Sequence, residues 1–191
     1  MIYPFLKRCV DVFFATIVIL FFWWLFALIW LFVRFDSAGS PIFVQDRVGI
    51  NGKLFKCMKF RTMTHETPQA GTHQISSNYV TRVGRVLRRT KLDELPQVWN
   101  ILRNEISLVG PRPCLPSQAK LVQLRDVAGI FRIKPGITGL AQVNNIDMSA
   151  PEQLVAWDLE YLNHRCFSTD VLIIISTFIG FGQGDRIRKE V

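Results

Sequence analysis

The chain has 191 residues, 49% of them hydrophobic, and its 23 Lys and Arg exceed its 15 Asp and Glu to give a net charge of +8. This length suits one domain with a real core, and the basic balance indicates an anionic partner such as nucleic acid, anionic lipid or a phosphorylated substrate. The four cysteines lie far apart and share no metal-ligand spacing with the three histidines, which argues against a zinc site and favours free thiols.

Residues 12–33 form a run of 22 residues without a charged side chain. As a helix the run would be about 33 Å long, enough to cross the hydrocarbon core of a bilayer. The alternative interpretation is a cleaved signal peptide, but the run is longer than the ~7–15 residues of a signal peptide's apolar region. We therefore expect a membrane-associated unit over residues 1–36, followed by one domain over residues 37–191.

The following segments alternate between strand and helix patterns. Residues 42–63 predict a β-hairpin whose turn is marked by Gly49 and Gly52, and residues 64–77 predict a surface loop. The arginine-rich residues 78–90 predict a helix with one apolar face. The mixture indicates the α/β class, as a compact helix and strand domain.

Further elements are expected in the second half of the chain. Residues 94–102 and 116–131 have helical patterns, residues 106–113 predict a short strand, and residues 134–143 predict a turn-rich loop. Ser149 and Glu152 have the spacing of a capping box and predict a helix that continues to about His164. Residues 170–182 are apolar but too short to span a bilayer, so they predict a core helix or one at the membrane interface.

Two adjacent acids, Asp93 and Glu94, stand out in this basic chain. Because Pro96 is tolerated only in the first turn of a helix, the helix is expected to begin at Asp93 or Glu94. An Asp near the N-cap is favoured in its ionised form, which suits a nucleophile or a metal ligand. The structural alternative is an ordinary N-cap without chemistry.

Basic residues are positioned to gather around this pair. Lys59 and Arg61 are two residues apart in a predicted strand and should share a face, while Arg88 precedes the pair and Arg112 follows it. Individually each is an ordinary surface charge, but together they could hold a polyanion, with a metal between carboxylates and phosphates. The glycine-rich fingerprints GxxxxGK[ST] and GxGxxG are absent from the sequence.

Five motifs in order carry a resemblance to a known family: KRCVD, KFRTM, KLDELPQVWNIL, SLVGPRP and KPGITGLAQVN. From about Lys7 to about residue 175 the chain resembles the bacterial sugar transferases, specifically the small monotopic phosphoglycosyl transferases. Each motif alone is modestly specific, whereas five in register are highly specific.

The resemblance implies an enzyme that transfers a phosphosugar from a UDP-sugar to polyprenol (undecaprenyl) phosphate and releases UMP, the first membrane step of glycoconjugate assembly. By resemblance, Asp93 is the nucleophile of a covalent phosphosugar intermediate, and Glu94, with Asp93, is associated with Mg²⁺. The implied substrate and phosphate contacts are Lys59, Arg61, Arg88, Arg112 and Gln142. The resemblance also implies a re-entrant N-terminal helix, interfacial amphipathic helices and a location at the cytoplasmic face of the bacterial inner membrane. It implies membrane lipid and no nucleic acid as a partner, and a homodimer is a further possibility.

Three departures from the family pattern affect these expectations. Trp23 and Trp24 stand where the family commonly has a Ser-Pro break in its membrane helix, which leaves a fully spanning helix as an alternative. Leu140 replaces a usual tryptophan, and Lys134 replaces a usual arginine. Both replacements could alter how the nucleotide or the sugar is bound.

Two rival functions differ in their chemistry. A non-enzymatic, membrane-tethered protein could bind RNA or anionic lipid through its basic helix, but it would need neither adjacent acids nor a covalent step. A transferase that uses a general base without a covalent intermediate has the same sequence features. Which UDP-sugar is used does not follow from the sequence.

Overall fold

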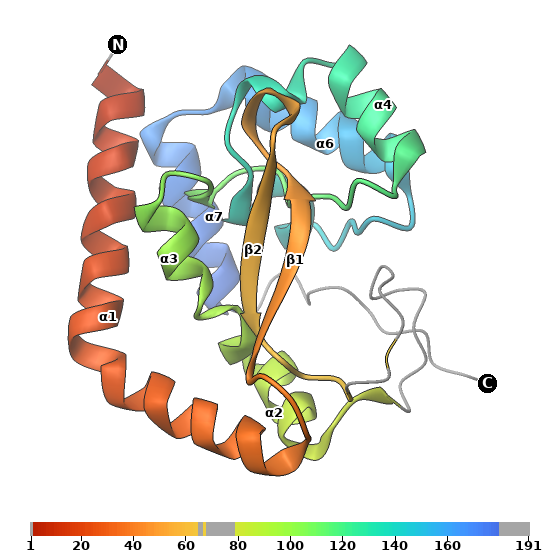
Figure 1. Ribbon diagram of the computed structural model, residues 1–191. Coiled ribbons are helices and arrows are strands. Elements are labelled where there is room, and N and C mark those ends of the chain that lie inside the picture. Colours follow the sequence, from red (N-terminus) through yellow and green to blue (C-terminus); the bar gives the residue numbers. More distant parts are fainter. Residues whose placement is uncertain (1, 65–66, 68–78, 180–191) are drawn as a thin grey trace.

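Helices surround two small two-stranded sheets in the part of the chain that the computed structural model describes, residues 2–64, 67 and 79–179 (Figure 1). The α-helices and strands, in chain order, are α1 Ile2–Asp36, β1 Ile42–Val48, β2 Leu54–Phe60, α2 Arg82–Thr90, α3 Gln97–Leu102, β3 Ser107–Val109, α4 Ala119–Val127, β4 Gly136–Thr138, α5 Leu140–Val143, α6 Pro151–His164 and α7 Phe167–Ile179. Short 3₁₀ turns connect some of these elements, among them η1 Ile50–Gly52, η4 Leu92–Glu94 and η5 Ile130–Arg132.

Helix α1 is the membrane-associated element that the sequence predicts. Among the described residues, α1 is the helix that is long and apolar enough to cross a membrane. Only 17% of its most apolar 18-residue stretch is buried. Its buried residues follow one stripe, Asp11, Ala15, Val18, Ile29 and Val33, which faces the rest of the molecule. Phenylalanine and tryptophan side chains are exposed on the other faces. The helix bends part way along its length (Figure 1), and the Trp24 indole N–H donates to the Phe21 carbonyl at 3.0 Å.

The N-terminal end of α1 is fixed to the domain by polar contacts. The Arg8 guanidinium donates to the carbonyl of Ile101 at 2.7 Å, at the C-terminal end of α3. The Asp11 carboxylate accepts from the Ser107 hydroxyl at 3.0 Å and from the Leu108 N–H at 2.9 Å. Charged side chains that would be expensive in lipid thereby find partners in the protein.

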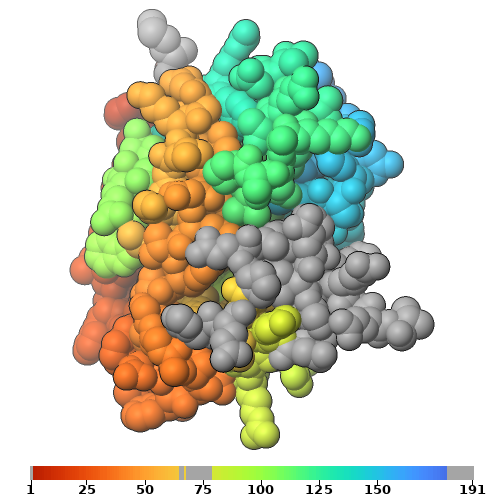
Figure 2. All heavy atoms as spheres, turned by 45° about the vertical axis from the view of Figure 1, so that its right-hand side comes forward, coloured from red at the N-terminus to blue at the C-terminus, as the bar shows by residue number. Residues whose placement is uncertain are grey.

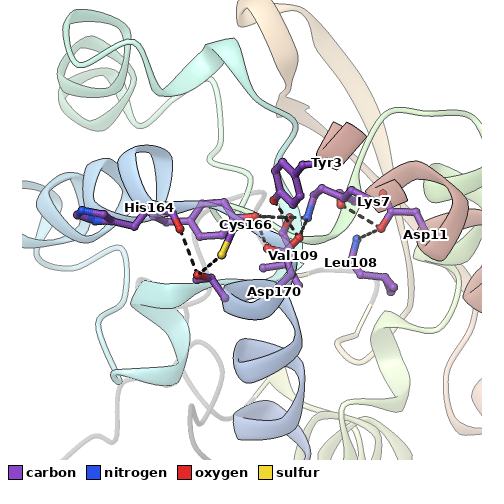
Figure 3. A network of polar contacts seen from close by, with 11 residues as sticks. Tyr3, Lys7, Asp11, Leu108, Val109, His164, Cys166 and Asp170 are labelled. Atoms are coloured by element: carbon purple, nitrogen blue, oxygen red, sulfur yellow. Dashed lines mark hydrogen bonds and ion pairs between the residues drawn. The ribbon is translucent and has the colours of Figure 1, made fainter. Parts of the chain in front are cut away.

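A second set of contacts joins this end of α1 to α6 and α7 (Figure 3). The Asp170 carboxylate accepts from the ammonium of Lys7 at 2.6 Å, from the hydroxyl of Tyr3 at 3.0 Å and from that of Tyr161 at 2.7 Å. Burial raises the pKa of Tyr161 and the nearby Asp170 charge raises it further, so its hydroxyl remains a donor.

The C-terminal end of α1 contacts the same domain at a different place. Asp36 accepts from the backbone N–H of Val83 in α2 at 3.0 Å, and Ile29 and Val33 pack with Phe60 and Leu87. Both ends of the apolar helix are therefore held by the domain that follows it.

Strands β1 and β2 form the predicted hairpin, antiparallel from Ile42↔Phe60 to Val48↔Leu54. The connection needs left-handed backbone at Asn51 (φ 55°) and Gly52 (φ 70°), a conformation that glycine adopts without strain. The hairpin lies at the front of Figure 2, with α3 on one side and the segment that carries α4 on the other.

The second sheet was only half predicted. The expected strand at residues 106–113 is β3, but its parallel partner β4 occupies the segment predicted as a loop, with Ser107 opposite Gly136. A Cβ on Gly136 would lie 2.1 Å from the backbone nitrogen of Gly110, so this close backbone approach requires glycine. The loop prediction was wrong because glycine usually indicates a turn, whereas Gly136 allows two strand backbones to approach each other closely.

Helix α6 occurs where it was predicted, and α7 begins three residues before the predicted segment 170–182, of which residues 180–182 lie outside the described residues. Helix α6 begins at Pro151, and its N-cap residue Ala150 offers no side-chain bond, so the capping box was wrong; the Ser149 hydroxyl bonds Asp147 instead. Helix α7 buries Ile173 and leaves Leu172, Ile175, Phe178 and Ile179 exposed.

Candidate active site

The acidic pair lies in a tight turn between α2 and α3. Lys91 ends α2 in the left-handed conformation (φ 58°), and Asp93 and Glu94 follow in the 3₁₀ turn η4. Pro96 is the N-cap residue of α3, which begins at Gln97. The prediction that the α-helix starts at Asp93 or Glu94 was therefore wrong, since the proline ended up before the helix and not in its first turn.

Glu94 is held as a carboxylate by two basic side chains. The Lys59 ammonium donates to its Oε1 atom at 2.6 Å, and the Arg112 guanidinium donates to the same atom at 3.1 Å. Burial alone would raise the pKa of Glu94, but these charges and hydrogen bonds outweigh it and lower the pKa to about 2. Glu94 is therefore ionised throughout the physiological pH range.

Asp93 behaves in the opposite way. Burial raises its pKa to about 6; the charge of Lys59 opposes that shift and the charge of Glu94 adds to it. The sequence argument expected a helix N-terminus to favour the anion, yet the pKa lies above the ordinary 3.8. Asp93 still remains mostly ionised at pH 7, as a carboxylate that is poorly compensated and correspondingly basic.

The basic residues predicted near the pair are only partly brought together. Lys59 and Arg112 contact Glu94 directly. Arg88 donates to the Thr62 hydroxyl at 2.7 Å, and its charge lowers the pKa of Asp93, which places it near the pair. Three of the predicted phosphate contacts thus surround the Asp93–Glu94 dyad.

Arg61 and Gln142 have other partners among the described residues. β2 ends at Phe60, and the buried Arg61 guanidinium donates to the Ser37 carbonyl at 2.8 Å, just beyond the end of α1. Lys59 therefore contacts Glu94 whereas Arg61 contacts the end of α1, so the two side chains have different partners. The Gln142 amide donates to the Ile137 carbonyl at 3.1 Å.

Sequence reasoning missed five of the residues that line the cleft beside the dyad, Arg47 among them. The cleft is lined by Arg47, Cys57, Lys59, Gln97, Arg112, Pro113 and Gly136. Arg47 is opposite Phe55 in the hairpin, so strand alternation puts it on the face that carries Lys59. The alternation of side chains along the strands could therefore have identified Arg47, but only once the register of the hairpin was known.

The loop that carries Arg112 is supported by two buried arginines. Arg47 donates to the Pro113 carbonyl at 2.9 Å, and Arg125 donates to the Arg112 carbonyl at 2.7 Å. Arg125 is itself paired with Asp158 at 2.6 Å, and both side chains are buried. The guanidinium of Arg112 thus extends from a backbone that is fixed at both sides.

The dyad could contribute two oxygen ligands to a metal ion. No cluster of three or more His, Cys, Asp or Glu suited to a metal occurs within the described ranges. One or two carboxylates with phosphate oxygens of a substrate are the usual environment of Mg²⁺. The residues present therefore fit Mg²⁺ only together with a phosphorylated substrate.

Comparison with known proteins finds a matching family and related sequences. The model of the family described as "Bacterial sugar transferase" matches residues 2–183. The exopolysaccharide production protein ExoY of Rhizobium meliloti is 37% identical over 190 residues, covering 90% of this chain and 83% of the relative. The UDP-glucose:undecaprenyl-phosphate glucose-1-phosphate transferases of Caulobacter vibrioides and Escherichia coli are 35% and 38% identical, covering 90% and 92% of this chain and 67% and 40% of their own lengths.

Proposed function

The chain belongs to the bacterial sugar transferase family and is a membrane-associated transferase, and we propose that it transfers a sugar phosphate from a UDP-sugar to undecaprenyl phosphate. Its relatives in Caulobacter and Escherichia coli are named for this reaction with UDP-glucose, whereas a relative in Aeromonas hydrophila, 35% identical, is named as an N-acetylgalactosaminephosphotransferase. The named relatives thus differ in the sugar that they transfer.

The proposed mechanism has two displacements at one phosphorus atom. A carboxylate oxygen of Asp93 attacks the sugar-linked phosphorus of the donor, the bond from that phosphorus to the bridging oxygen breaks, and UMP leaves with the electron pair. An oxygen of polyprenol phosphate then attacks the same phosphorus and releases the Asp93 carboxylate. The products are UMP and polyprenol diphosphate sugar.

One observation carries this assignment, the opposite tuning of the two adjacent acids. Glu94 is neutralised by Lys59 and Arg112, whereas burial raises the pKa of Asp93 to about 6. A more basic carboxylate is a better nucleophile, and at pH 7 it is still mostly deprotonated. Arg88 and Arg112 would reduce the repulsion between Asp93 and an incoming diphosphate.

Magnesium is part of the proposal. Glu94 and Asp93 would hold the ion together with phosphate oxygens of the donor. When bound, Mg²⁺ would offset the charge of the diphosphate and of the departing UMP.

The proposed topology has both ends of α1 on the cytoplasmic side of the inner membrane. Arg8 and Asp11 join its beginning to the domain, and Asp36 joins its end to α2. A straight crossing would put one of these ends on the side opposite to the domain. The bond from the Trp24 indole to the Phe21 carbonyl supports a bend, because a bend in lipid leaves carbonyls that need donors.

Helix α7 would lie at the membrane interface beside α1. Its residue Asp170 contacts Lys7 of α1, and its exposed apolar side chains provide a face that suits the acyl boundary.

The direct test is a panel of UDP-sugars offered with undecaprenyl phosphate to the purified protein in lipid nanodiscs. Release of UMP that depends on both substrates would support the reaction. A UDP-sugar-dependent phosphosugar adduct on Asp93, detected by mass spectrometry, would separate the covalent route from a general-base route. UMP release without any adduct in rapidly quenched samples would favour the latter.

A further inference from the structure

An apolar groove lies on the side of the hairpin opposite to the cleft of the dyad. Its cavity volume is about 220 Å³. Its walls come from four parts of the chain: Phe26 and Trp30 of α1, Ile42 of β1, Met58 and Phe60 of β2, and Pro96 and Trp99 at the start of α3. None of these side chains carries a charge.

The groove has a closed floor and an open mouth. Phe60 and Pro96 are buried at its floor. Trp30 and Trp99 retain 45% and 46% of their exposure, so they flank the opening. Large apolar side chains kept half-exposed around a hollow favour an apolar occupant.

The groove and the dyad share two structural parts. Lys59 lies between Met58 and Phe60 in β2, and its side chain emerges on the other face of the strand to contact Glu94. Pro96 comes two residues after Glu94 in the same turn. A molecule that reached from the dyad into the groove would therefore need to pass only one strand edge or one turn.

We propose that this groove binds the isoprene units nearest to the phosphate of the polyprenol acceptor. The proposal rests on the proposed function, since it concerns the second substrate of that reaction. A UDP-sugar is charged and polar and has no group that matches an uncharged apolar lining, whereas the acceptor has an apolar chain directly attached to the reacting phosphate.

The size and position of the groove fit this occupant. Its volume is below the roughly 300–1,000 Å³ of sites that enclose a whole ligand, so it suits a short part of a long chain. One wall belongs to the membrane-associated helix α1, so the remainder of the chain can stay in the bilayer. The acceptor would then enter sideways from the lipid and deliver its phosphate to the dyad.

The test uses a polyprenyl phosphate with a photoreactive diazirine in its first isoprene unit, added to the full chain in nanodiscs. After irradiation, mass spectrometry should find the label on peptides that contain Met58 or Trp99. Excess undecaprenyl phosphate should remove the label, and excess phosphatidylglycerol should not.

Two groove variants and one control define the outcome. Trp99→Ala and Met58→Gln should each reduce labelling about tenfold, the change that ~1.4 kcal/mol of lost affinity produces. Val127→Ala, at a position on α4 that is 84% exposed and outside the groove, should not reduce it. Trp99 is half-exposed, so its variant should fold even if Met58→Gln does not.

Several results would overturn the groove assignment. Label confined to the exposed face of α1, labelling unchanged in both variants, or equal competition by phosphatidylglycerol would each indicate an ordinary lipid contact. UMP release is measured in the same samples. Labelling with the expected pattern but no UMP release from any donor would contradict the proposed reaction and leave the groove assignment standing.

Discussion

Asp93→Asn is expected to stop sugar-phosphate transfer and to stabilise the protein at neutral pH. Burial raises the pKa of Asp93 from 3.8 to about 6, so the folded state holds an ionised carboxylate in an unfavourable place. One pKa unit corresponds to ~1.36 kcal/mol, and a shift of roughly two units sets an upper limit of about 3 kcal/mol for the gain. Asparagine keeps the shape of the side chain and removes both the charge and the nucleophile.

The pH dependence of this gain follows from the sign of the shift. Because the pKa of Asp93 is higher in the folded state, protonation favours folding, and the wild type loses stability as the pH rises from about 4 through 6. The variant lacks this loss. The difference in Tm between variant and wild type should therefore be largest above pH 7 and should shrink below pH 6. Glu94 is present in both proteins, and its lowered pKa acts only in more acidic solution.

Thermal unfolding in detergent micelles between pH 5 and pH 8, with UMP release measured in parallel, tests both halves of this prediction. Asp126→Asn is the matched control, since it neutralises an exposed carboxylate on α4 and should change neither Tm nor turnover appreciably. A variant at position 93 that was less stable than the wild type at pH 7.5 would refute the electrostatic argument. Retained transfer activity would refute the role of Asp93 as nucleophile.

Three other predictions concern the metal, the cations and the topology. EDTA should stop turnover and Mg²⁺ should restore it, whereas Glu94→Gln should stay inactive at any Mg²⁺ concentration; full activity in excess EDTA would contradict this. Arg88→Ala and Arg112→Ala should each lower kcat/KM on the order of 100-fold, while Arg82→Ala, at an exposed position on α2, should have little effect; equal losses at all three would indicate a diffuse anion patch. A single cysteine in place of Ile2, in an otherwise cysteine-free variant, should react with an impermeant thiol reagent only after the inner membrane is permeabilised. Labelling from the periplasmic side of intact membranes would instead show that α1 crosses the membrane completely.

Local sequence signals were sufficient where a segment decides its own structure. Residues 12–33 are helical because no other structure satisfies the backbone of an apolar stretch of that length. The hairpin follows from strand patterns on both sides of a turn that Gly49 and Gly52 mark in the sequence. The parallel pair β3–β4 could not be predicted in the same way, because its two strands are separated by the whole of α4 and its hydrogen bonds depend on a partner far along the chain.

The positions of two arginines show the same limit of local sequence signals. Arg61 and Lys59 are two residues apart, yet Arg61 lies beyond the end of β2 and fixes the end of α1. Arg47 and Lys59 are twelve residues apart, yet the hairpin register puts them on one face of the cleft. Spacing in the sequence predicts a shared face only inside one regular element, and the end of that element is the least predictable feature.

The different roles of the two acids depend on contacts that no local pattern contains. Lys59 is 35 positions from Glu94 and Arg112 is 18 positions from it, and both donate to the same oxygen atom of Glu94. From its position in the sequence Asp93 was expected to be favoured as an anion by a helix start, whereas the fold compensates Glu94 and leaves Asp93 with burial as the dominant influence. If Lys59 had paired with Asp93, the pKa of Asp93 would be lower and its oxygen a weaker nucleophile. The choice of Glu94 as the partner of both cations is thus the structural reason for assigning the attack on phosphorus to Asp93.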